Sequence, residues 1–152
     1  MTTASDCLAK LQGKTLVTAE SLTGGGIGAA ITAISGASKV FLGGIISYTD
    51  QVKNQVLGVP EGMLADFGAV SAPVAEAMAV GARNLLKADV AVSVTGLAGP
   101  NGDDYGNPVG TVFIGYADAT RSLAREYHFS GDRETIRNQT IQSSLRLILE
   151  NV

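Results

Sequence analysis

Short apolar segments typical of buried strands alternate along this chain with segments of helical spacing, and this alternation restricts the fold more than any other feature. Residues 15–19 form the first apolar segment, and the glycines after it lead into a helical pattern over residues 24–34. A strand without a polar face predicts a sheet covered on both sides, as in parallel sheets with crossover helices. The alternation therefore predicts an α/β protein.

The remaining segments continue this alternation to the end of the chain. Further strands are predicted over residues 43–48, 89–95, 109–117 and 123–129. Helices are predicted over residues 5–11 and 50–57, from residue 60, over residues 71–87 and from residue 132. Residues 96–108 contain four glycines and two prolines, a composition that predicts a loop.

The last two predicted strands lie close together in the sequence and form a hairpin, which adds an antiparallel strand to the sheet. We therefore expect a three-layer α/β/α sandwich with a mixed, largely parallel sheet. No repeat or linker interrupts the chain, and 45% of its residues are hydrophobic. Residues 1–152 are accordingly expected to form a single domain with its own core.

Composition and charge limit the partners and the compartment. The formal net charge is −3 without any block of Lys and Arg, whereas a nucleic-acid-binding surface needs clustered cations. Cys7 is the single cysteine, and neither a signal peptide nor an apolar run of about 20 residues is present. We expect a cytoplasmic protein without nucleic-acid or membrane partners. Few charges favour a homo-oligomer, although an ordinary core explains the apolar residues equally well.

Ser21 lies where the first predicted strand passes into glycines, in the segment Ala19-Glu20-Ser21-Leu22-Thr23-Gly24-Gly25-Gly26. The first N–H groups of a helix are unpaired and carry partial positive charge, so an oxyanion or a phosphate could bind beside this hydroxyl. A plain turn with Ser21 or Thr23 as the helix N-cap explains the segment equally well. The segment alone leaves both interpretations open.

Two other glycine-containing segments resemble nucleotide-binding motifs only in part. Gly13-Lys14-Thr15 lacks the upstream glycine of a P-loop and precedes a strand. Residues 24–29 fit the pattern G-x-G-x-x-A, but a segment rich in Gly and Ala produces this pattern by chance. We interpret the first segment as a turn and the second as a site of close helix packing.

Few residues are available for catalysis. His128 is the only histidine and lies inside a predicted strand, where a structural role is the commoner one. No group of His, Cys or carboxylates has metal-ligand spacing, and we interpret Asp103 and Asp104 as solvated, so no metal is predicted. A serine activated by a lysine remains, and Lys53 follows a predicted strand end near Tyr48. As a base, Lys53 would need a pKa well below about 10.4; without further support it is a solvated helix residue.

Several segments together resemble one family. They are Thr18-Ala19-Glu20-Ser21-Leu22-Thr23-Gly24-Gly25, Gly36-Ala37-Ser38, Tyr48 with Lys53, Gly68-Ala69-Val70-Ser71, Thr95-Gly96-Leu97-Ala98-Gly99-Pro100, Pro108-Val109-Gly110-Thr111-Val112 and Gly131-Asp132-Arg133. In this order they resemble the C-terminal domain of the CinA (competence/damage-inducible) family, whose members include nicotinamide-nucleotide amidases. The resemblance covers nearly the whole chain and implies an α/β/α sandwich in its stand-alone form.

The resemblance also implies an activity, which is hydrolysis of the carboxamide of nicotinamide mononucleotide without a metal or an organic cofactor. It implies that Ser21 is the nucleophile and that Lys53 takes the serine proton and later passes it to ammonia. It implies that Tyr48 orients the lysine or relays the proton. The oxyanion would be stabilised by the backbone N–H groups of Thr23, Gly24 and Gly25.

A small nucleotide substrate needs a site for its phosphate. Arg133 and Arg137 are four residues apart in the last predicted helix and share one face of it. They either bind the phosphate or form surface pairs with Glu134 or Asp132. The loop at the carboxyl end of a buried strand is the usual ligand site of an open α/β sheet. We expect it to line the nucleotide pocket with Thr95, Gly96, Ala98 and Gly99.

Two segments depart from the family pattern. Leu22 stands where many relatives have a cysteine, which the implied chemistry does not use. Residues 101–107 are less glycine-rich than usual, which leaves the substrate preference open. The alternative function is a non-catalytic nucleotide- or phosphate-binding regulatory module linked to competence or DNA damage. Such a module needs the anion-binding turn but no lysine base.

Overall fold

A five-stranded sheet forms the middle layer of the protein, whose computed structural model describes residues 4–152. Its order is β2-β1-β3-β4-β5. The strands are β1 (Leu16–Glu20), β2 (Phe41–Ile46), β3 (Val90–Gly96), β4 (Thr111–Ala117) and β5 (Ser122–His128). β1 pairs in parallel with β2 and β3, whereas β4 is antiparallel to both β3 and β5. The predicted mixed sheet, largely parallel with an antiparallel strand from the late hairpin, is confirmed.

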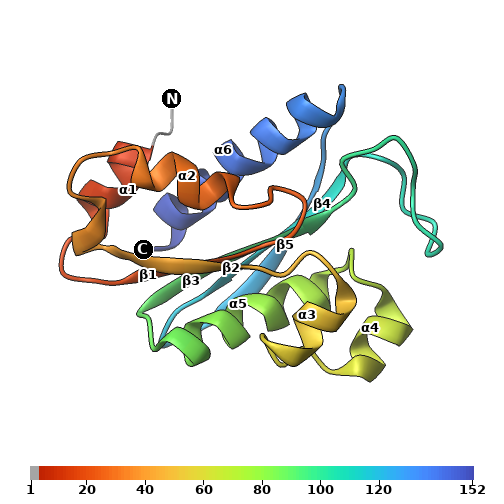
Figure 1. Ribbon diagram of the computed structural model, residues 1–152, viewed down its shortest axis with the longest axis horizontal. Coiled ribbons are helices and arrows are strands. Elements are labelled where there is room, and N and C mark those ends of the chain that lie inside the picture. Colours follow the sequence, from red (N-terminus) through yellow and green to blue (C-terminus); the bar gives the residue numbers. More distant parts are fainter. Residues whose placement is uncertain (1–3) are drawn as a thin grey trace.

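Helices cover both faces of this sheet (Figure 1). One face carries α1 (Ala4–Lys10), α2 (Gly26–Thr32) and α6 (Arg133–Asn151). The other face carries α3 (Asp50–Gln55), α4 (Glu61–Phe67) and α5 (Ala72–Leu86). A short 3₁₀ helix, η1 (Ala37–Lys39), precedes β2. The predicted three-layer α/β/α sandwich is therefore correct.

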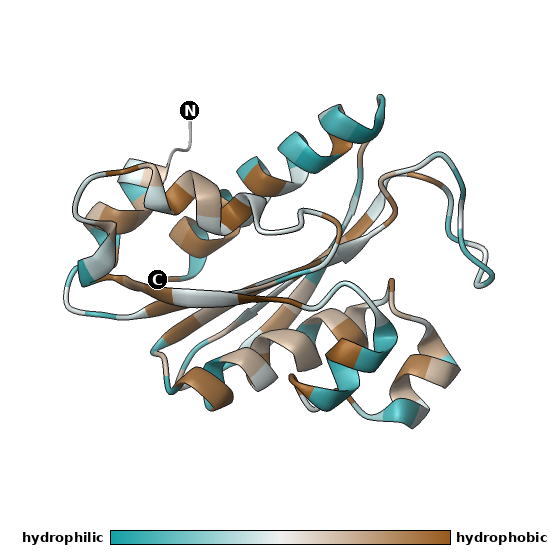
Figure 2. Cartoon of the chain, viewed as in Figure 1, coloured by the Kyte–Doolittle hydropathy of each residue, from teal (hydrophilic) through white to brown (hydrophobic). Residues whose placement is uncertain are grey.

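The central strands are buried because each face of the sheet has its own core. Leu16 packs into the core beneath α1, α2 and α6, whereas its neighbour Val17 packs into the core beneath α5. Figure 2 shows brown segments along the strands and the helices packed on them, whereas the hydrophilic residues gather on the first turns of α6, on α3 and on the long loop after β3. Two covered faces explain why every residue of β1 is buried and why a largely apolar segment predicted this strand.

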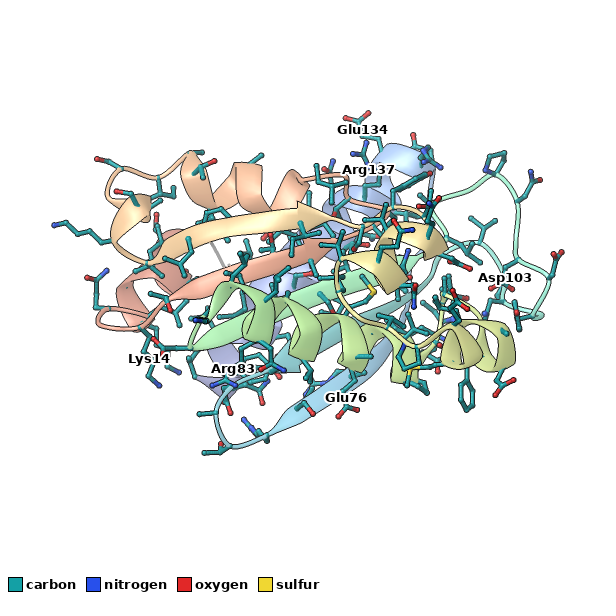
Figure 3. All side chains as sticks on the ribbon, turned by 60° about the horizontal axis from the view of Figure 1, so that its bottom comes forward. Lys14, Glu76, Arg83, Asp103, Glu134 and Arg137 are labelled. Carbon is teal, nitrogen blue, oxygen red and sulfur yellow. The ribbon has the colours of Figure 1, made fainter. Side chains whose placement is uncertain are left out.

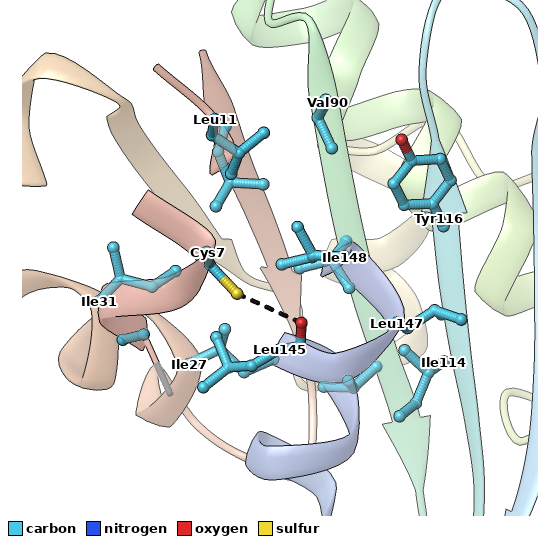
Figure 4. Packing of buried hydrophobic residues seen from close by; sticks show 14 of the residues in the cluster. Cys7, Leu11, Ile27, Ile31, Val90, Ile114, Tyr116, Leu145, Leu147 and Ile148 are labelled. Carbon is cyan, nitrogen blue, oxygen red and sulfur yellow. Dashed lines mark hydrogen bonds between the residues drawn. The ribbon is translucent and has the colours of Figure 1, made fainter. Parts of the chain in front are cut away.

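Cys7 belongs to the first of these cores (Figure 4). Its Sγ atom donates a hydrogen bond to the carbonyl of Leu145 on α6, at 3.2 Å. Burial raises the pKa of the Cys7 thiol to about 11. The thiol is therefore protonated at neutral pH and ties α1 to α6.

The carboxyl ends of the parallel strands place three connections at one end of the sheet. β1 leads into the glycine turn, β2 leads through residues 47–49 into α3, and β3 leads into the long loop of residues 97–110, which projects from the body of the molecule (Figure 1). This end is where open α/β sheets bind ligands. None of the helices in residues 4–152 is long and apolar enough to cross a membrane.

Candidate active site

A cavity of about 480 Å³ opens at this end of the sheet. Its lining includes eight of the residues predicted from the sequence, namely Ser21, Tyr48, Lys53, Thr95, Gly96, Ala98, Gly99 and Arg133. Four separate chain segments supply these eight residues, from the turn after β1 to the start of α6. Figure 3 shows this end of the molecule, marked by Asp103 on the long loop and Arg137 on α6, opposite Lys14.

Ser21 and Lys53 meet at the bottom of the cavity. Lys53 Nζ donates a hydrogen bond to Ser21 Oγ at 3.2 Å. The same Nζ also donates to the carbonyls of Ser47 at 2.9 Å and Tyr48 at 3.2 Å. The connection between β2 and α3 is only three residues long, so the first turns of α3 place the lysine beside the end of β1. The predicted pair is thus within hydrogen-bonding distance.

Burial governs the ionisation of Lys53. Its side chain is only 1% exposed, and no carboxylate within residues 4–152 lies at salt-bridge distance from it. Burial lowers the pKa of Lys53 below its ordinary value, and the charge of Asp50 opposes this shift in part. A lowered pKa increases the fraction of neutral amine at neutral pH, and only the neutral amine can accept the Ser21 proton.

Tyr48 contributes to this pair through its backbone. Its carbonyl oxygen accepts hydrogen bonds from both Lys53 Nζ and Ser21 Oγ. Its side chain is 58% exposed, and its hydroxyl accepts a hydrogen bond from Arg133 Nη2 at 3.4 Å. The main chain of Tyr48 therefore contacts both Lys53 and Ser21, whereas its phenol lies beside Arg133.

The turn after Ser21 uses one of the three N–H groups expected to bind an oxyanion. Gly24 N–H donates to the Ser21 carbonyl at 3.0 Å, so this group is not available to a ligand. The N–H groups of Thr23 and Gly25 make no hydrogen bond to any part of the chain that the structure describes. Gly24 and Gly25 both have positive φ, at 58° and 102°, which explains why this turn needs glycines.

Glu20 is a residue of this turn that sequence reasoning missed. Its carboxylate is 2% exposed and accepts hydrogen bonds from Thr18 Oγ1, Thr23 Oγ1 and the first N–H groups of α2, on Ile27 and Gly28. It therefore caps α2, where the N-cap residue Gly25 has no side chain to do so. The sequence signal that could have indicated this cap is an acidic residue directly before a glycine turn that leads into a helix.

The two arginines of α6 have different surroundings. Arg133 lines the cavity and donates from Nη1 to the carbonyl of Gly99 at 2.6 Å. Arg137, one turn later, lies outside the cavity lining and donates from Nε to Leu22 O at 2.9 Å and from Nη2 to Thr23 O at 3.0 Å. The predicted arginine pair is therefore corrected: only Arg133 faces the cavity, because α6 runs past the turn and brings Arg137 against it.

The loop after β3 forms another wall of the cavity. Thr95 Oγ1 donates to Ala69 O at 2.9 Å, which joins the end of β3 to the segment before α5. At Gly96 a Cβ atom would lie 2.8 Å from Thr111 O, so only glycine allows this approach to β4. The loop is attached to α4 through Tyr105, whose hydroxyl donates to Ala65 O at 2.8 Å.

Asp103 organises this loop from within. Its carboxylate is partly exposed and accepts hydrogen bonds from the N–H groups of Tyr105 and Asn107 and from the Asn107 side-chain amide. Burial tends to raise the pKa of Asp103, but these hydrogen bonds lower it overall. Within residues 4–152, no three His, Cys, Asp or Glu side chains are grouped as metal ligands would be.

His128 lies away from these residues. It is exposed on β5, contacts Glu126 and does not line the cavity that contains Ser21. A Ser-His-Asp arrangement, which the sequence left possible, is therefore absent from this site. Of His128 and Lys53, Lys53 is the one within hydrogen-bonding distance of Ser21.

Comparison with known proteins gives one consistent family. The model of the CinA C-terminal domain matches residues 2–152. A CinA-like protein of Geobacter metallireducens is 50% identical over 133 residues, which are 88% of this chain and 32% of that protein. One of Synechococcus sp. (strain CC9311) is 58% identical over 102 residues, covering 67% of this chain and 24% of that protein. The chain thus spans about a third or less of these curated relatives.

Solved structures agree with this match. A competence-damaged protein (CinA) superfamily protein from Escherichia coli superposes with a TM-score of 0.92 at 35% identity, covering 97% of this chain and 86% of that one. The competence/damage inducible protein CihA from Agrobacterium tumefaciens superposes with a TM-score of 0.93 at 36% identity, covering 97% and 92%. Both similarities extend over nearly the whole chain.

Proposed function

We propose that this chain, which belongs to the CinA C-terminal domain family, is an amidase that hydrolyses the carboxamide of nicotinamide mononucleotide. The products are nicotinic acid mononucleotide and ammonia. The observation that carries this proposal is the 3.2 Å contact between Ser21 Oγ and a buried Lys53 whose pKa is lowered. A nucleophile next to a base within hydrogen-bonding distance is the arrangement that acyl transfer requires.

In the first half-reaction, Ser21 Oγ attacks the carboxamide carbon while neutral Lys53 Nζ accepts the hydroxyl proton. The carbonyls of Ser47 and Tyr48 hold the resulting ammonium in place, because each already accepts a hydrogen bond from Nζ. The tetrahedral intermediate carries a negative charge on oxygen, which a backbone N–H of the Ser21 turn can stabilise. Lys53 then returns its proton to the leaving nitrogen, the C–N bond breaks, and ammonia leaves an ester on Ser21.

In the second half-reaction, water replaces ammonia. Lys53 is neutral again and takes a proton from the water as its oxygen attacks the ester carbon. Collapse of the second tetrahedral intermediate breaks the bond to Ser21 Oγ, which regains its proton from Lys53. One water is consumed for each amide hydrolysed, and Lys53 carries the proton in both half-reactions.

The cavity supports a nucleotide as the substrate. Its volume of about 480 Å³ is in the range that small-molecule sites have. Arg133 lies at the rim with its Nη atoms near Gly99 O and the Tyr48 hydroxyl, where a guanidinium can pair with a phosphate. We propose that Arg133 binds the phosphate and that the loop at Thr95, Gly96, Ala98 and Gly99 encloses the nucleoside.

The direct test measures ammonia and nicotinic acid mononucleotide formed from nicotinamide mononucleotide by the purified protein, with a chelator present. We expect turnover by the wild type and none above background by Ser21→Ala. Calorimetry with Lys53→Met adds a second readout, since this variant is expected to bind the nucleotide without turning it over. Binding by the wild type without turnover would instead support the regulatory binding module.

Assembly and location are also proposals. We propose that copies of this chain associate with one another and that the protein acts in the cytoplasm. Light scattering after size-exclusion chromatography tests the assembly against the 15.5 kDa mass of one chain. A mass of one chain at micromolar concentration would contradict it. Cell fractionation followed by immunoblotting tests the location.

A further inference from the structure

Arg137 makes two hydrogen bonds to consecutive peptide groups directly after Ser21. Its Nε atom donates to Leu22 O at 2.9 Å, and its Nη2 atom donates to Thr23 O at 3.0 Å. The side chain is half-buried and comes from α6, more than a hundred residues further along the chain. Because a guanidinium holds its donors in a fixed plane, these two bonds restrict the orientation of both peptide groups.

The conformation of the turn defines which way its N–H groups point. Gly24 N–H bonds to Ser21 O, so residues 21–24 form a β-turn with the serine in first position. Among residues 4–152 the only non-glycine residue with positive φ is Lys87, which excludes turn types that need positive φ at Leu22 or Thr23. The remaining common type is type I. In this turn the N–H of the third residue points to the side on which the side chain of the first residue lies, and an Asp, Asn or Ser in the first position often accepts a hydrogen bond from it.

A type I turn over residues 21–24 places the Thr23 N–H on the same side as Ser21 Oγ. A trans peptide group is planar, with its C=O and N–H pointing in opposite directions. The Leu22 carbonyl points at Arg137, so the N–H of the same peptide group points away from α6. Thr23 is 1% exposed, and its N–H has no partner in the described part of the chain. A buried N–H without a partner is costly unless something binds it.

We propose that Arg137 is a positioning residue that holds the Thr23 N–H in place to bind the oxyanion formed at Ser21. This inference rests on the proposed amidase function, because the oxyanion arises when Ser21 attacks the amide. Arg137 acts through the backbone and does not contact the substrate. The role differs from phosphate binding, for which its Nε and Nη2 donors are already engaged.

The test compares four proteins with nicotinamide mononucleotide as substrate, namely the wild type, Arg137→Gln, Arg137→Lys and Arg146→Gln. Arg146→Gln is the matched control, since it removes a guanidinium from the same helix at a site lined by Phe129 and Gln142, away from the turn. Circular dichroism establishes that each variant is folded at the assay temperature. If Arg137→Gln does not fold, Arg137→Lys decides the outcome, because it keeps the cation but lacks the planar pair of donors.

A second readout does not depend on the substrate. A fluorophosphonate reacts with an activated serine, so that the Ser21 Oγ–P bond forms, the P–F bond breaks, fluoride leaves and Lys53 takes the proton. Its P–O⁻ group in the transition state needs the same N–H donor as the amide oxyanion. Intact-mass spectrometry measures the rate of this labelling in each protein.

We expect Arg137→Gln to lower kcat by about 10²-fold or more, the effect of losing one oxyanion donor, with KM changed less than about threefold. Labelling should slow by a similar factor, Arg137→Lys should be intermediate, and Arg146→Gln should match the wild type. A raised KM with unchanged kcat would instead make Arg137 a phosphate contact and overturn the proposal. Unchanged kcat and labelling would overturn it as well.

The two readouts separate this proposal from the proposed function. Wild-type labelling that depends on Arg137, without turnover of nicotinamide mononucleotide, would refute the substrate and support the positioning role. Turnover that is insensitive to Arg137 would support the amidase and refute the positioning role. If the wild type shows neither turnover nor labelling, both the proposed function and the positioning role are refuted.

Discussion

At the scale of single residues, Lys53 is the group whose chemistry depends most on its surroundings. Its ammonium has only oxygen acceptors around it, from Ser21, Ser47 and Tyr48, and burial favours the neutral amine. A lysine on a solvated helix face would be protonated and unable to act as a base at neutral pH. In the proposed mechanism Lys53 can serve as a base because the β2–α3 connection buries it.

This environment predicts how activity depends on pH. The base must be neutral, so kcat/KM should rise as the pH increases and level off above the pKa of Lys53 in the free enzyme. Because burial lowers that pKa, the plateau should begin below about 10.4. Asp50→Asn removes the charge that opposes this shift, and it should move the rise to lower pH. A rise centred at or above the ordinary lysine value would contradict the role of Lys53, as would a shift in the opposite direction in Asp50→Asn.

Glu20 has a structural role that predicts a loss of stability. Glu20→Ala leaves the N–H groups of Ile27 and Gly28 without their acceptor, and it should lower the free energy of unfolding by about 2–4 kcal/mol. Glu20→Gln keeps one carbonyl oxygen and should lose less. Urea unfolding followed by circular dichroism measures both variants. Equal stability of wild type and Glu20→Ala would show that the cap is dispensable.

At the scale of elements, α5 fits against the segment after α3 through one glycine. A Cβ atom at Gly81 would lie 2.0 Å from the backbone oxygen of Leu57, so the helix and that segment cannot both keep their positions with a larger residue. Gly62 in α4 has nothing within 4 Å of the same position. Two helical glycines thus differ in their surroundings and not in their local conformation.

This difference makes them a matched pair for a stability test. Gly81→Ala should destabilise the protein by about 1–3 kcal/mol or more, because the added methyl group overpacks this contact. Gly62→Ala should stabilise it by about 0.5–1 kcal/mol, because alanine favours the helix. Thermal unfolding of the two variants beside the wild type gives both values. The account of α5 packing fails if the two substitutions have the same sign.

At the scale of the whole molecule, acid should weaken the fold. Burial alone would raise the pKa of Asp118, but hydrogen bonds from Thr120, Tyr116 and Arg121 lower it to about 2. The unfolded chain then binds more protons than the folded one as the pH falls below about 3.8, so the stabilising contribution is present above that pH and is lost towards pH 2. Urea midpoints at pH 6, 4 and 3 should decrease in that order.

The Asp118→Asn variant is the control for this dependence. It removes the titrating group at the β4–β5 turn, so its urea midpoint should fall less between pH 4 and pH 3 than that of the wild type. Asp103 and Asp132, whose pKa values are also lowered, still titrate in this variant. An identical fall in both proteins would mean that Asp118 contributes nothing to acid stability.

The architecture as a whole could be predicted from the sequence because it follows from local periodicity. Apolar strands, helical spacing and glycine turns depend on neighbours a few residues away, so the order of elements and the hairpin were accessible. The position of Ser21 at a strand end and of Lys53 after the next strand also follow from this order. Topology then brings both to the same end of the sheet.

The sequence by itself thus determined the three-layer fold, the mixed sheet and most of the segments that line the cavity, but not that of Ala69 and Val70. Only the tertiary structure decided that Arg137 holds the turn while Arg133 faces the cavity, and that Tyr48 acts on Lys53 through its carbonyl. The reason is physical: Arg137 and Leu22 are 115 residues apart, and no local pattern encodes which helix face meets a distant turn. Such contacts depend on how whole elements pack, to within the reach of a hydrogen bond.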